Sequence, residues 1–525
     1  MSPRHLATAR WRLTAAAGAL ATGLAVAVAQ APAAPAAPAA SAAPRVSWQA
    51  CPQYSDAVLG ALGFGDNIAA FRALWARTQC GTLQVPLDYS TPDGRRITIA
   101  FTRLPATDQA HRLGSLALNP GGPGGSGYLM PFQLAVPGSP AAGLDTRYDL
   151  LGVDLRGIGY SSKLECPPGP RQSQDPTLTQ AQARSLYDAQ AAANQACVAK
   201  DQAFMAQETT ANAARDLNQL RIALHQDKLS YLGVSWGTAL GAVYRSLFPA
   251  SVGRMWLDSV MDPAGTIGAD AATRAAAAQR DFGRFAAWIA ARDSSYGFGT
   301  TAAQVSAALL AMSRALDATP VTFTDISQPI DGGLVAGLST QSSPSWSENA
   351  QVLTELRGAK SGTTAPPAVK QLLSTPPPPQ PPAGPPEQNN QAAKLALTCN
   401  ALPASFAAYW QAHQLTVSRY PFGQGGFGPQ CAGWPLPVRP WPLRHTAAPL
   451  EMSGHRWEVT TPYPWARQMQ ALIGGILFTV NDDVHADAPA VPDCAAHIVG
   501  YFNTGAPGPG QCTGSPLPAS PAPGT

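Results

Sequence analysis

Residues 233–237, with the sequence Gly-Val-Ser-Trp-Gly, have the spacing that a nucleophilic serine requires. Glycines on both sides of a serine permit a sharp turn from a strand into a helix, which exposes the hydroxyl. A strand-like run, 229–232, precedes the motif, and a helix-like run, 238–247, follows it. The bare pattern also arises by chance, and a structural turn that happens to hold serine is the alternative. Its placement between a strand and a helix favours Ser235 as a catalytic nucleophile.

A nucleophilic serine needs a histidine base, and proteins with this turn carry their catalytic residues in the order serine, carboxylate, histidine. That order leaves the histidines at positions 413, 445, 455, 485 and 497. His485 lies on a polar loop just after a predicted strand, where an imidazole can swing over the serine. His497 lies in an apolar helical pattern and is interpreted as a packed helix residue. We therefore expect His485 to be the general base.

The carboxylate that orients the base is expected to be Glu458, which follows a predicted strand and precedes His485. A carboxylate at this place holds the imidazole and stabilises its charged form. The main alternative acid is Asp258, at the end of an earlier strand, and Asp482 and Asp483 are weaker candidates. An ordinary solvated loop glutamate is the alternative interpretation of Glu458.

A glycine-rich loop, residues 119–127, follows a predicted strand. Such a loop brings backbone N–H groups close to a substrate oxygen, and a second N–H comes from the residue after the nucleophile. We expect Gly122 and Trp236 to form an oxyanion hole. A phosphate-binding loop would need a lysine that this segment lacks, and a flexible surface loop is the other alternative.

Strand-like and helix-like segments alternate around these motifs, which predicts an α/β protein with a mostly parallel sheet and helices on both faces. Ligands bind at the carboxyl ends of such strands. The expected strands are 81–85, 97–104, 115–119, 148–154, 229–233, 254–258, 450–453 and 474–480. The expected helices include 210–224, 271–292, 302–316 and 463–473.

The chain is expected to divide into an exported leader, a core in two parts and an insertion. Residues 1–29 combine arginines with an acid-free apolar run, which is typical of a signal peptide, and an uncleaved membrane anchor is the alternative. The other predicted parts are a disordered Ala/Pro-rich tether at 30–44, core segments at 45–263 and 441–525, and a helical lid at 264–440 with an extended Pro-rich linker at 366–386.

Eight cysteines, an even number, accompany the predicted export signal and indicate disulfides. Their spacing predicts the pairs Cys51–Cys80, Cys166–Cys197, Cys399–Cys431 and Cys494–Cys512. The sequence contains no Cys-x-x-Cys pattern, and no metal site is expected. The net charge of +3, with 35 scattered lysines and arginines, argues against nucleic-acid binding.

Together these motifs resemble the secreted tripeptidyl aminopeptidases, α/β-hydrolase serine peptidases related to the proline iminopeptidases. The resemblance covers most of the chain after the leader. It rests on segments 85–89, 119–127, 154–157, 210–221, 231–249, 257–263 and 454–462, together with His485 and the Cys494–Cys512 couple. It implies the α/β-hydrolase fold with a C-terminal region like that of the tripeptidyl aminopeptidases.

The resemblance implies an enzyme that releases short peptides, tripeptides in the family, from free N-termini through an acyl-enzyme on Ser235. It implies peptide substrates, no metal or cofactor, a monomer, and a secreted or periplasmic location without stable membrane insertion after signal cleavage. Exopeptidase action also needs a carboxylate for the substrate ammonium. The candidates in the predicted lid are Asp325, Asp331, Glu348 and Glu355.

Three departures from the family pattern leave substrate preference open. Trp236 stands where relatives usually carry tyrosine, Glu458 where they carry aspartate, and Ala401 where they often carry aspartate. A secreted carboxylester hydrolase with the same triad is one alternative, which a carboxylate anchor in the pocket would argue against. A non-catalytic envelope binding protein is the other, and it is favoured if Glu458 and His485 do not converge on Ser235.

Overall fold

The computed structural model describes residues 44–170, 172–173, 177–374, 388–422 and 426–519. The predicted signal peptide at 1–29 and nearly all of the tether at 30–44 lie outside the described residues.

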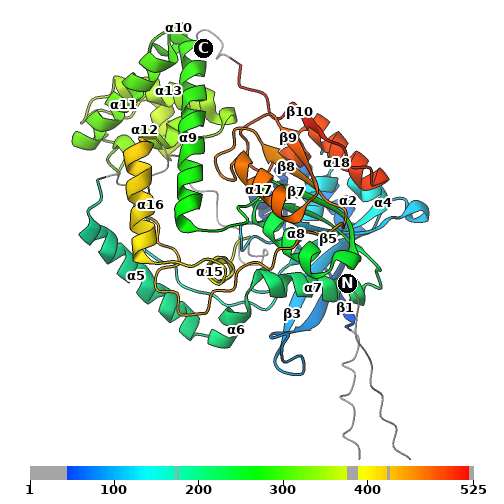
Figure 1. Ribbon diagram of the computed structural model, residues 1–525. Helices are drawn as coiled ribbons and strands as arrows, with labels where there is room; N and C mark the ends of the chain where they lie inside the picture. Colours follow the sequence, from blue (N-terminus) through cyan, green and yellow to red (C-terminus); the bar gives the residue numbers. More distant parts are fainter. Residues whose placement is uncertain (1–43, 171, 174–176, 375–387, 423–425, 520–525) are drawn as a thin grey trace, which may run out of the picture. The chain divides into compact units, whose positions relative to one another are not determined.

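A ten-stranded sheet forms the core of the described chain (Figure 1). Its strands are β1 (Val46–Gln49), β2 (Gln79–Pro86), β3 (Arg96–Leu104), β4 (Gly114–Asn119), β5 (Tyr148–Asp154), β6 (Leu229–Val234), β7 (Val252–Asp258), β8 (Glu451–His455), β9 (Ile476–Val480) and β10 (Gly510–Cys512). The order across the sheet is β1-β2-β3-β5-β4-β6-β7-β8-β9-β10. Pairings from β1 to β5 are antiparallel, and those from β5 to β10 are parallel. This arrangement confirms the predicted α/β class with a mostly parallel sheet.

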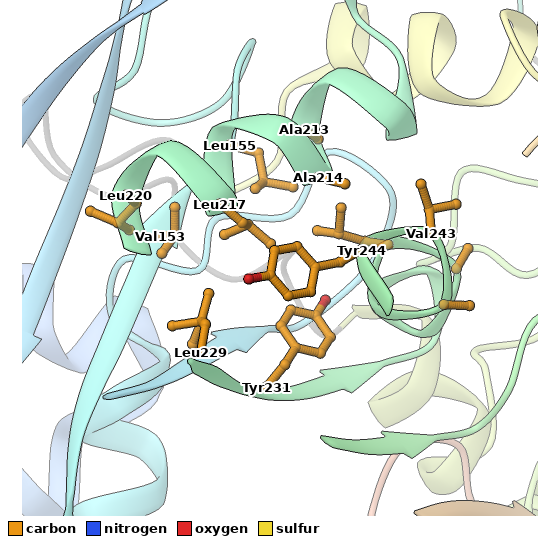
Figure 2. Close-up of a cluster of buried hydrophobic side chains, with 14 of the residues drawn as sticks. Val153, Leu155, Ala213, Ala214, Leu217, Leu220, Leu229, Tyr231, Val243 and Tyr244 are labelled. Atoms are coloured by element: carbon orange, nitrogen blue, oxygen red, sulfur yellow. The ribbon is translucent and has the colours of Figure 1, made fainter. Parts of the chain in front are cut away.

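The central strands are short and apolar because helices cover both of their faces. Every residue of β5 and β6 is buried. On one face, α7 (Thr210–Ala223), α8 (Trp236–Leu247) and α17 (Tyr463–Ile473) pack on the sheet. Figure 2 shows part of this cluster, including Leu217, Leu220, Tyr231, Val243 and Tyr244.

The opposite face is covered by α2 (Ile68–Ala76), α3 (Met130–Ala135), α4 (Leu144–Arg147) and α18 (Pro492–Thr504). Residues 56–76 are long and apolar enough to cross a membrane by length and composition alone. Phe71 is fully buried, however, and its ring lies 5.1 Å from that of Phe132 in α3. We therefore interpret this segment as part of the core.

The described residues between β7 and β8 form helices and no strand. These helices are α9 (Ile267–Ala290), α10 (Asp293–Tyr296), α11 (Ala302–Ala318), α12 (Gly332–Ser339), α13 (Trp346–Arg357), α14 (Pro367–Ser374), α15 (Gln391–Cys399) and α16 (Phe406–Arg419), with the short 3-10 helix η5 (Ser343–Ser345). Helices α9, α11, α12, α13 and α14 share an apolar core of their own. The remaining α-helices of the described chain are α1 (Asp56–Leu59), α5 (Gln180–Ala199) and α6 (Gln202–Gln207).

The prediction of an extended linker at 366–386 is wrong for its first part. Residues Pro367–Ser374 form α14, and Val369 is fully buried. A proline is tolerated in the first turn of a helix, and the Glu355 carboxylate accepts hydrogen bonds from the N–H groups of Ala368 and Val369 at 2.8 and 3.2 Å. The proline content of the segment gave no indication that a carboxylate from another helix caps its first turn. Residues 375–387 lie outside the described residues.

Four disulfides join the cysteines in the pairs that their spacing predicts. They are Cys51–Cys80, Cys166–Cys197, Cys399–Cys431 and Cys494–Cys512. The first connects the segment after β1 to β2, and the last connects α18 to β10. The paired cysteines are 18 to 32 positions apart in the sequence, so each of the four bonds joins neighbouring segments of the chain.

Candidate active site

Ser235 occupies a strained turn between β6 and α8. Its φ of 57° and ψ of −127° lie outside the regions that non-glycine residues ordinarily adopt. Both glycines of the motif are required because neither position has room for a side chain. A Cβ on Gly233 would lie 2.5 Å from the Gly237 carbonyl oxygen, and one on Gly237 would lie 2.7 Å from Asn119 Oδ1. Strain at a serine that such close packing holds in place is typical of a nucleophile elbow.

The glycine-rich loop after β4 lies directly against this turn. A Cβ on Gly121 would lie 2.4 Å from the Val234 carbonyl oxygen and 3.0 Å from the Trp236 nitrogen. Within the described part of the chain, the N–H groups of Gly122 and Trp236 donate no hydrogen bond to the protein. They are therefore available to a substrate oxygen, and their role as an oxyanion hole stays a prediction.

The loop is also held by the helical insertion. Ser126 N–H donates to the Gln388 carbonyl at 3.0 Å, and Asn390 N–H donates to the Gly124 carbonyl at 2.9 Å. Because these bonds come from the segment that leads into α15, the insertion fixes the loop that would bind the substrate oxygen.

Glu458 and His485 form a direct pair. His485 Nδ1 lies 2.5 Å from Glu458 Oε1. Glu458 is almost fully buried, and its Oε1 also accepts hydrogen bonds from the N–H and the hydroxyl of Thr461, at 2.8 and 2.5 Å. Ser259 Oγ donates to the other carboxylate oxygen at 3.0 Å. These donors hold the carboxylate in place. The His485 side chain is 31% exposed, and its Nε2 has no hydrogen-bond partner among the described residues.

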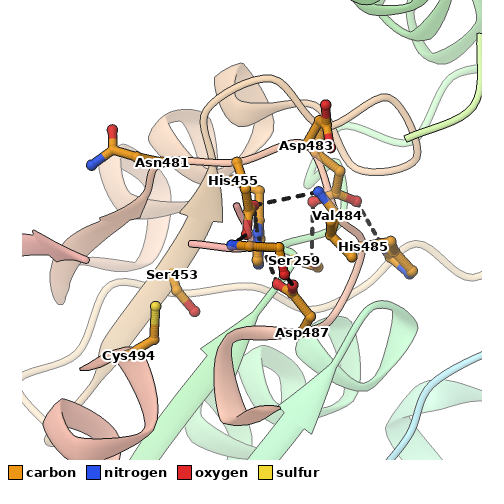
Figure 3. Close-up of polar contacts among 12 residues, drawn as sticks. Ser259, Ser453, His455, Asn481, Asp483, Val484, His485, Asp487 and Cys494 are labelled. Atoms are coloured by element: carbon orange, nitrogen blue, oxygen red, sulfur yellow. Dashed lines mark hydrogen bonds and ion pairs between the residues drawn. The ribbon is translucent and has the colours of Figure 1, made fainter. Parts of the chain in front are cut away.

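Ser259 connects this pair to the nucleophile. Its hydroxyl accepts a hydrogen bond at 2.9 Å from the N–H of Ala486, the residue after His485. On the other side, Ser235 N–H donates to the carbonyl of Asp258 at 2.9 Å, so the two serines belong to adjacent backbone segments. Figure 3 shows the contacts that surround Ser259. Ser235 Oγ and His485 form no hydrogen bond with each other here, and such bonds often tighten only when substrate binds.

The rival carboxylates have other partners. Asp258 Oδ1 lies 3.1 Å from His455 Nε2, and Asp482 Oδ1 lies 2.6 Å from His455 Nδ1. Asp483 Oδ2 lies 2.5 Å from Arg284 of α9. Among the described residues, Glu458 is therefore the acid that bonds to the predicted base.

His455 and Arg284 were not expected from the sequence to contribute to this site. The strand expected to end at residue 453 continues to His455, which is fully buried instead of lying on a loop. Arg284 lies in the insertion, almost 200 positions before Asp483 in the sequence. A histidine within a strand and an arginine on a helix have ordinary structural interpretations, so no local signal marked either one.

The acids considered for a substrate ammonium hold mainly structural positions. Asp325 Oδ2 lies 2.9 Å from the Lys370 ammonium, Asp331 caps α12, and Glu355 caps α14. Glu348 is exposed on α13 and has no hydrogen bond to the described chain. The geometry therefore selects none of the four as the anchor.

Among the residues that the structure describes, two groups of side chains bring possible metal-ligand atoms within 4.8 Å of one another. The first contains Cys494 and Cys512, which are already joined in a disulfide. The second contains His455, Asp482 and Asp487, but the 2.6 Å hydrogen bond between His455 and Asp482 occupies the coordinating nitrogen. Both groups are thus explained without an ion.

The sheet order, the strained serine turn and the glycine loop together are those of the α/β-hydrolase fold, and the family comparison agrees. A family model described as the alpha/beta hydrolase fold matches residues 115–370. The described chain therefore has the α/β-hydrolase fold, and this match covers slightly less than half of the sequence.

Among curated proteins, the chain is similar to the tripeptidyl aminopeptidase of Streptomyces coelicolor, with 37% identity over 246 residues, which are 43% of each chain. It is also 37% identical to serine protease Hip1 of Mycobacterium tuberculosis over 195 residues, 35% of this chain and 36% of that one. Carboxylesterase B of the same organism is 29% identical over 268 residues, 50% of this chain and 48% of that one. The chain thus spans about half or less of the length of these relatives.

Among solved structures, the proline iminopeptidase-related protein of Thermus thermophilus aligns over 80% of this chain and 94% of its own. The identity is 14% and the TM-score is 0.33.

Proposed function

We propose that the chain is an exported serine exopeptidase that releases short peptides, of tripeptide length, from free N-termini. The observation that carries the proposal is the Glu458–His485 pair, which is anchored through Ser259 beside the strained Ser235 turn. The similarity to a tripeptidyl aminopeptidase and to a serine protease supports peptides as the substrate class.

The reaction follows from the roles that these groups are suited to. Ser235 Oγ attacks the scissile carbonyl carbon while His485 Nε2 takes the hydroxyl proton. The carbonyl oxygen gains negative charge, which the N–H groups of Gly122 and Trp236 stabilise. His485 returns its proton to the leaving amine, the C–N bond breaks, and an ester to Ser235 remains. Water then attacks this ester with His485 again as the base, which frees the short peptide and restores the serine.

Glu458 orients His485 throughout this cycle. Its carboxylate fixes the proton on Nδ1, so that Nε2 is the basic nitrogen that faces the serine. It also stabilises the imidazolium that forms after proton transfer. Because Thr461 and Ser259 supply three further hydrogen bonds to this carboxylate, its orientation toward His485 is fixed.

An export route is supported by the four disulfides, which persist in oxidising compartments. We propose a secreted or periplasmic location, with the leader at 1–29 removed.

A carboxylester hydrolase with the same triad is the second candidate. The similarity to carboxylesterase B favours it, and a serine triad with an oxyanion hole cleaves esters as well as amides. The two candidates differ in whether a free substrate amine raises the rate.

A library of peptide amides, each made with a free and with an acetylated N-terminus, tests the proposal. Mass spectrometry of the products should show release of short N-terminal peptides from the free series and little turnover of the blocked series, with the Ser235→Ala variant inactive on both. Equal turnover of both series, or hydrolysis of simple acyl esters alone, would favour the esterase. No hydrolysis of either class, with a wild-type protein that resists serine-directed reagents, would favour a binding protein.

A further inference from the structure

A second histidine, His455, lies buried close to the catalytic pair. It is the last residue of β8, and its side chain has no solvent exposure. Its Nδ1 lies 2.6 Å from Asp482 Oδ1, and its Nε2 lies 3.1 Å from Asp258 Oδ1. Ser453 Oγ donates to the same Asp258 oxygen at 2.5 Å. The imidazole is thus held between two carboxylates.

This arrangement determines the charge of the ring. An ionised carboxylate accepts hydrogen bonds and donates none, so a ring with a carboxylate on each nitrogen must carry both protons. Burial alone would lower the pKa of His455, but Asp258 and Asp482 outweigh it and raise the pKa well above its ordinary value. Burial would likewise raise the pKa of Asp258, yet His455 and Ser453 hold it below the ordinary value.

Asp482 belongs to the loop that carries the predicted base. Its Oδ1 accepts a hydrogen bond from Val484 N–H at 3.3 Å, and its Oδ2 accepts one from Ser515 N–H at 2.7 Å. The backbone carbonyl of His455 accepts a bond from Glu458 N–H at 3.4 Å. His455 therefore contacts both segments that supply the catalytic pair, and it ties them to the end of β7 through Asp258.

We propose that His455 is a positioning residue, a permanently charged imidazolium that fixes the loop of residues 481–487 and so holds His485 against Glu458. This inference rests on the proposed function, because it assigns His485 the role of the base.

Five titratable groups bear on the charge of His455. Asp258 comes from β7, Asp482 and Asp487 come from the loop, and the Glu458–His485 pair lies beyond them. Burial raises the pKa of Asp487, and so does the neighbouring Asp482. Because a carboxylate accepts from each ring nitrogen, His455 stays charged across the neutral range, and alkaline pH that removes a ring proton breaks one of the two bonds.

Nuclear magnetic resonance of the wild-type protein with ¹⁵N-labelled histidine tests the charge without any substrate. We expect one ring to carry protons on both nitrogens and to keep them from pH 5 to pH 9. The signals of this doubly protonated ring should vanish in His455→Gln. If that variant fails to fold, the same signals should shift in Ser453→Ala, which removes only the hydroxyl bonded to Asp258. A His455 ring that carries one proton, or that titrates within this range, would overturn the proposal.

Kinetics test the positioning role. We expect His455→Gln to lower kcat on peptide amides about 100-fold with little change in KM, because a small displacement of a catalytic group has an effect of that size. The rate of labelling by a serine-directed phosphonate should fall in parallel, which separates this proposal from the choice of substrate. The double variant His455→Gln/Asp258→Asn should melt at a higher temperature than His455→Gln, because it removes one of the carboxylates left without a counter-charge.

His497→Gln is the matched control. His497 also pairs with a buried carboxylate on β8, since its Nε2 lies 2.6 Å from Glu451 Oε1, but it lies on α18 and forms no hydrogen bond with the described 481–487 loop. We expect this variant to keep wild-type kcat and labelling rate. Equal losses in His497→Gln and His455→Gln, or wild-type kcat in His455→Gln, would show that His455 has no positioning role.

Discussion

Replacing Glu458 by glutamine removes one charge while keeping the size of the side chain. The amide oxygen can occupy the place of Oε1, where it still accepts from His485 Nδ1 and from Thr461. The amide nitrogen then faces Ser259 Oγ, which can accept from it. The hydrogen-bond pattern and the histidine tautomer survive, so the loss is mainly the attraction between a carboxylate and the imidazolium.

The size of that attraction sets the expected rate. With charge centres about 4 Å apart and an effective dielectric constant of about 20, the interaction is about 4 kcal/mol. Since 1.36 kcal/mol corresponds to a tenfold change in rate, losing it lowers kcat about 1,000-fold. The charge matters most in the transition state, so KM should change little.

Stopped assays on a peptide amide, with Asp258→Asn as the comparison, test this reasoning. Asp258 bonds to His455 and Ser453, so its amide variant should lower the melting temperature and reduce kcat far less than Glu458→Gln does. A larger loss of kcat in Asp258→Asn than in Glu458→Gln would assign the role of the triad acid to Asp258 and refute the account.

Three further predictions concern the helical insertion, a buried acid and the disulfides. Arg284 pairs with Asp281 and Asp483 and stacks on Trp457. Arg284→Met should therefore weaken the attachment of α9 by about 3 kcal/mol. Hydrogen exchange should then show about 100-fold faster opening of that helix alone, and unchanged protection of α9 would contradict the prediction. Burial raises the pKa of Glu208 from 4.5 to about 8, so the folded protein holds a proton that the unfolded chain releases, and stability falls as pH rises between these values. The melting temperature of Glu208→Gln, relative to that of the wild type, should therefore rise from pH 5 to pH 8. A difference between the two melting temperatures that does not change with pH would refute the raised pKa of Glu208. Removing the Cys494–Cys512 bond, which spans 18 positions, should cost about 3 kcal/mol in denaturant unfolding, and peptide mapping of the unreduced wild type should find no free thiol.

The serine turn and the sheet were predictable because their causes are local. A strained elbow needs glycine on both sides of the serine, and the space around Gly233 and Gly237 shows why. Buried parallel strands are short apolar runs, so β5 and β6 were visible in the sequence. Chain order alone reduced the choice of base to five histidines.

The contacts that hold the predicted base depend instead on long-range pairing. His455 meets Asp258 because β7 and β8 are neighbours in the sheet, a pairing of segments about 200 positions apart. Arg284 meets Asp483 only after the insertion folds back on the core. The helix α14 was missed because its first-turn N–H groups are capped by Glu355 from another helix. No periodicity within one segment encodes such contacts.

The central claim is that Ser235 is the nucleophile of a serine hydrolase. Incubation of the full chain with a peptidyl phosphonate that has a free N-terminus, followed by intact-mass analysis and peptide mapping, tests it most directly. The account predicts one adduct per chain, located on Ser235, together with complete loss of peptide turnover; the Ser235→Ala variant should fold normally, take no label and release no peptide. Normal turnover by Ser235→Ala, or an adduct on any other residue, would contradict it.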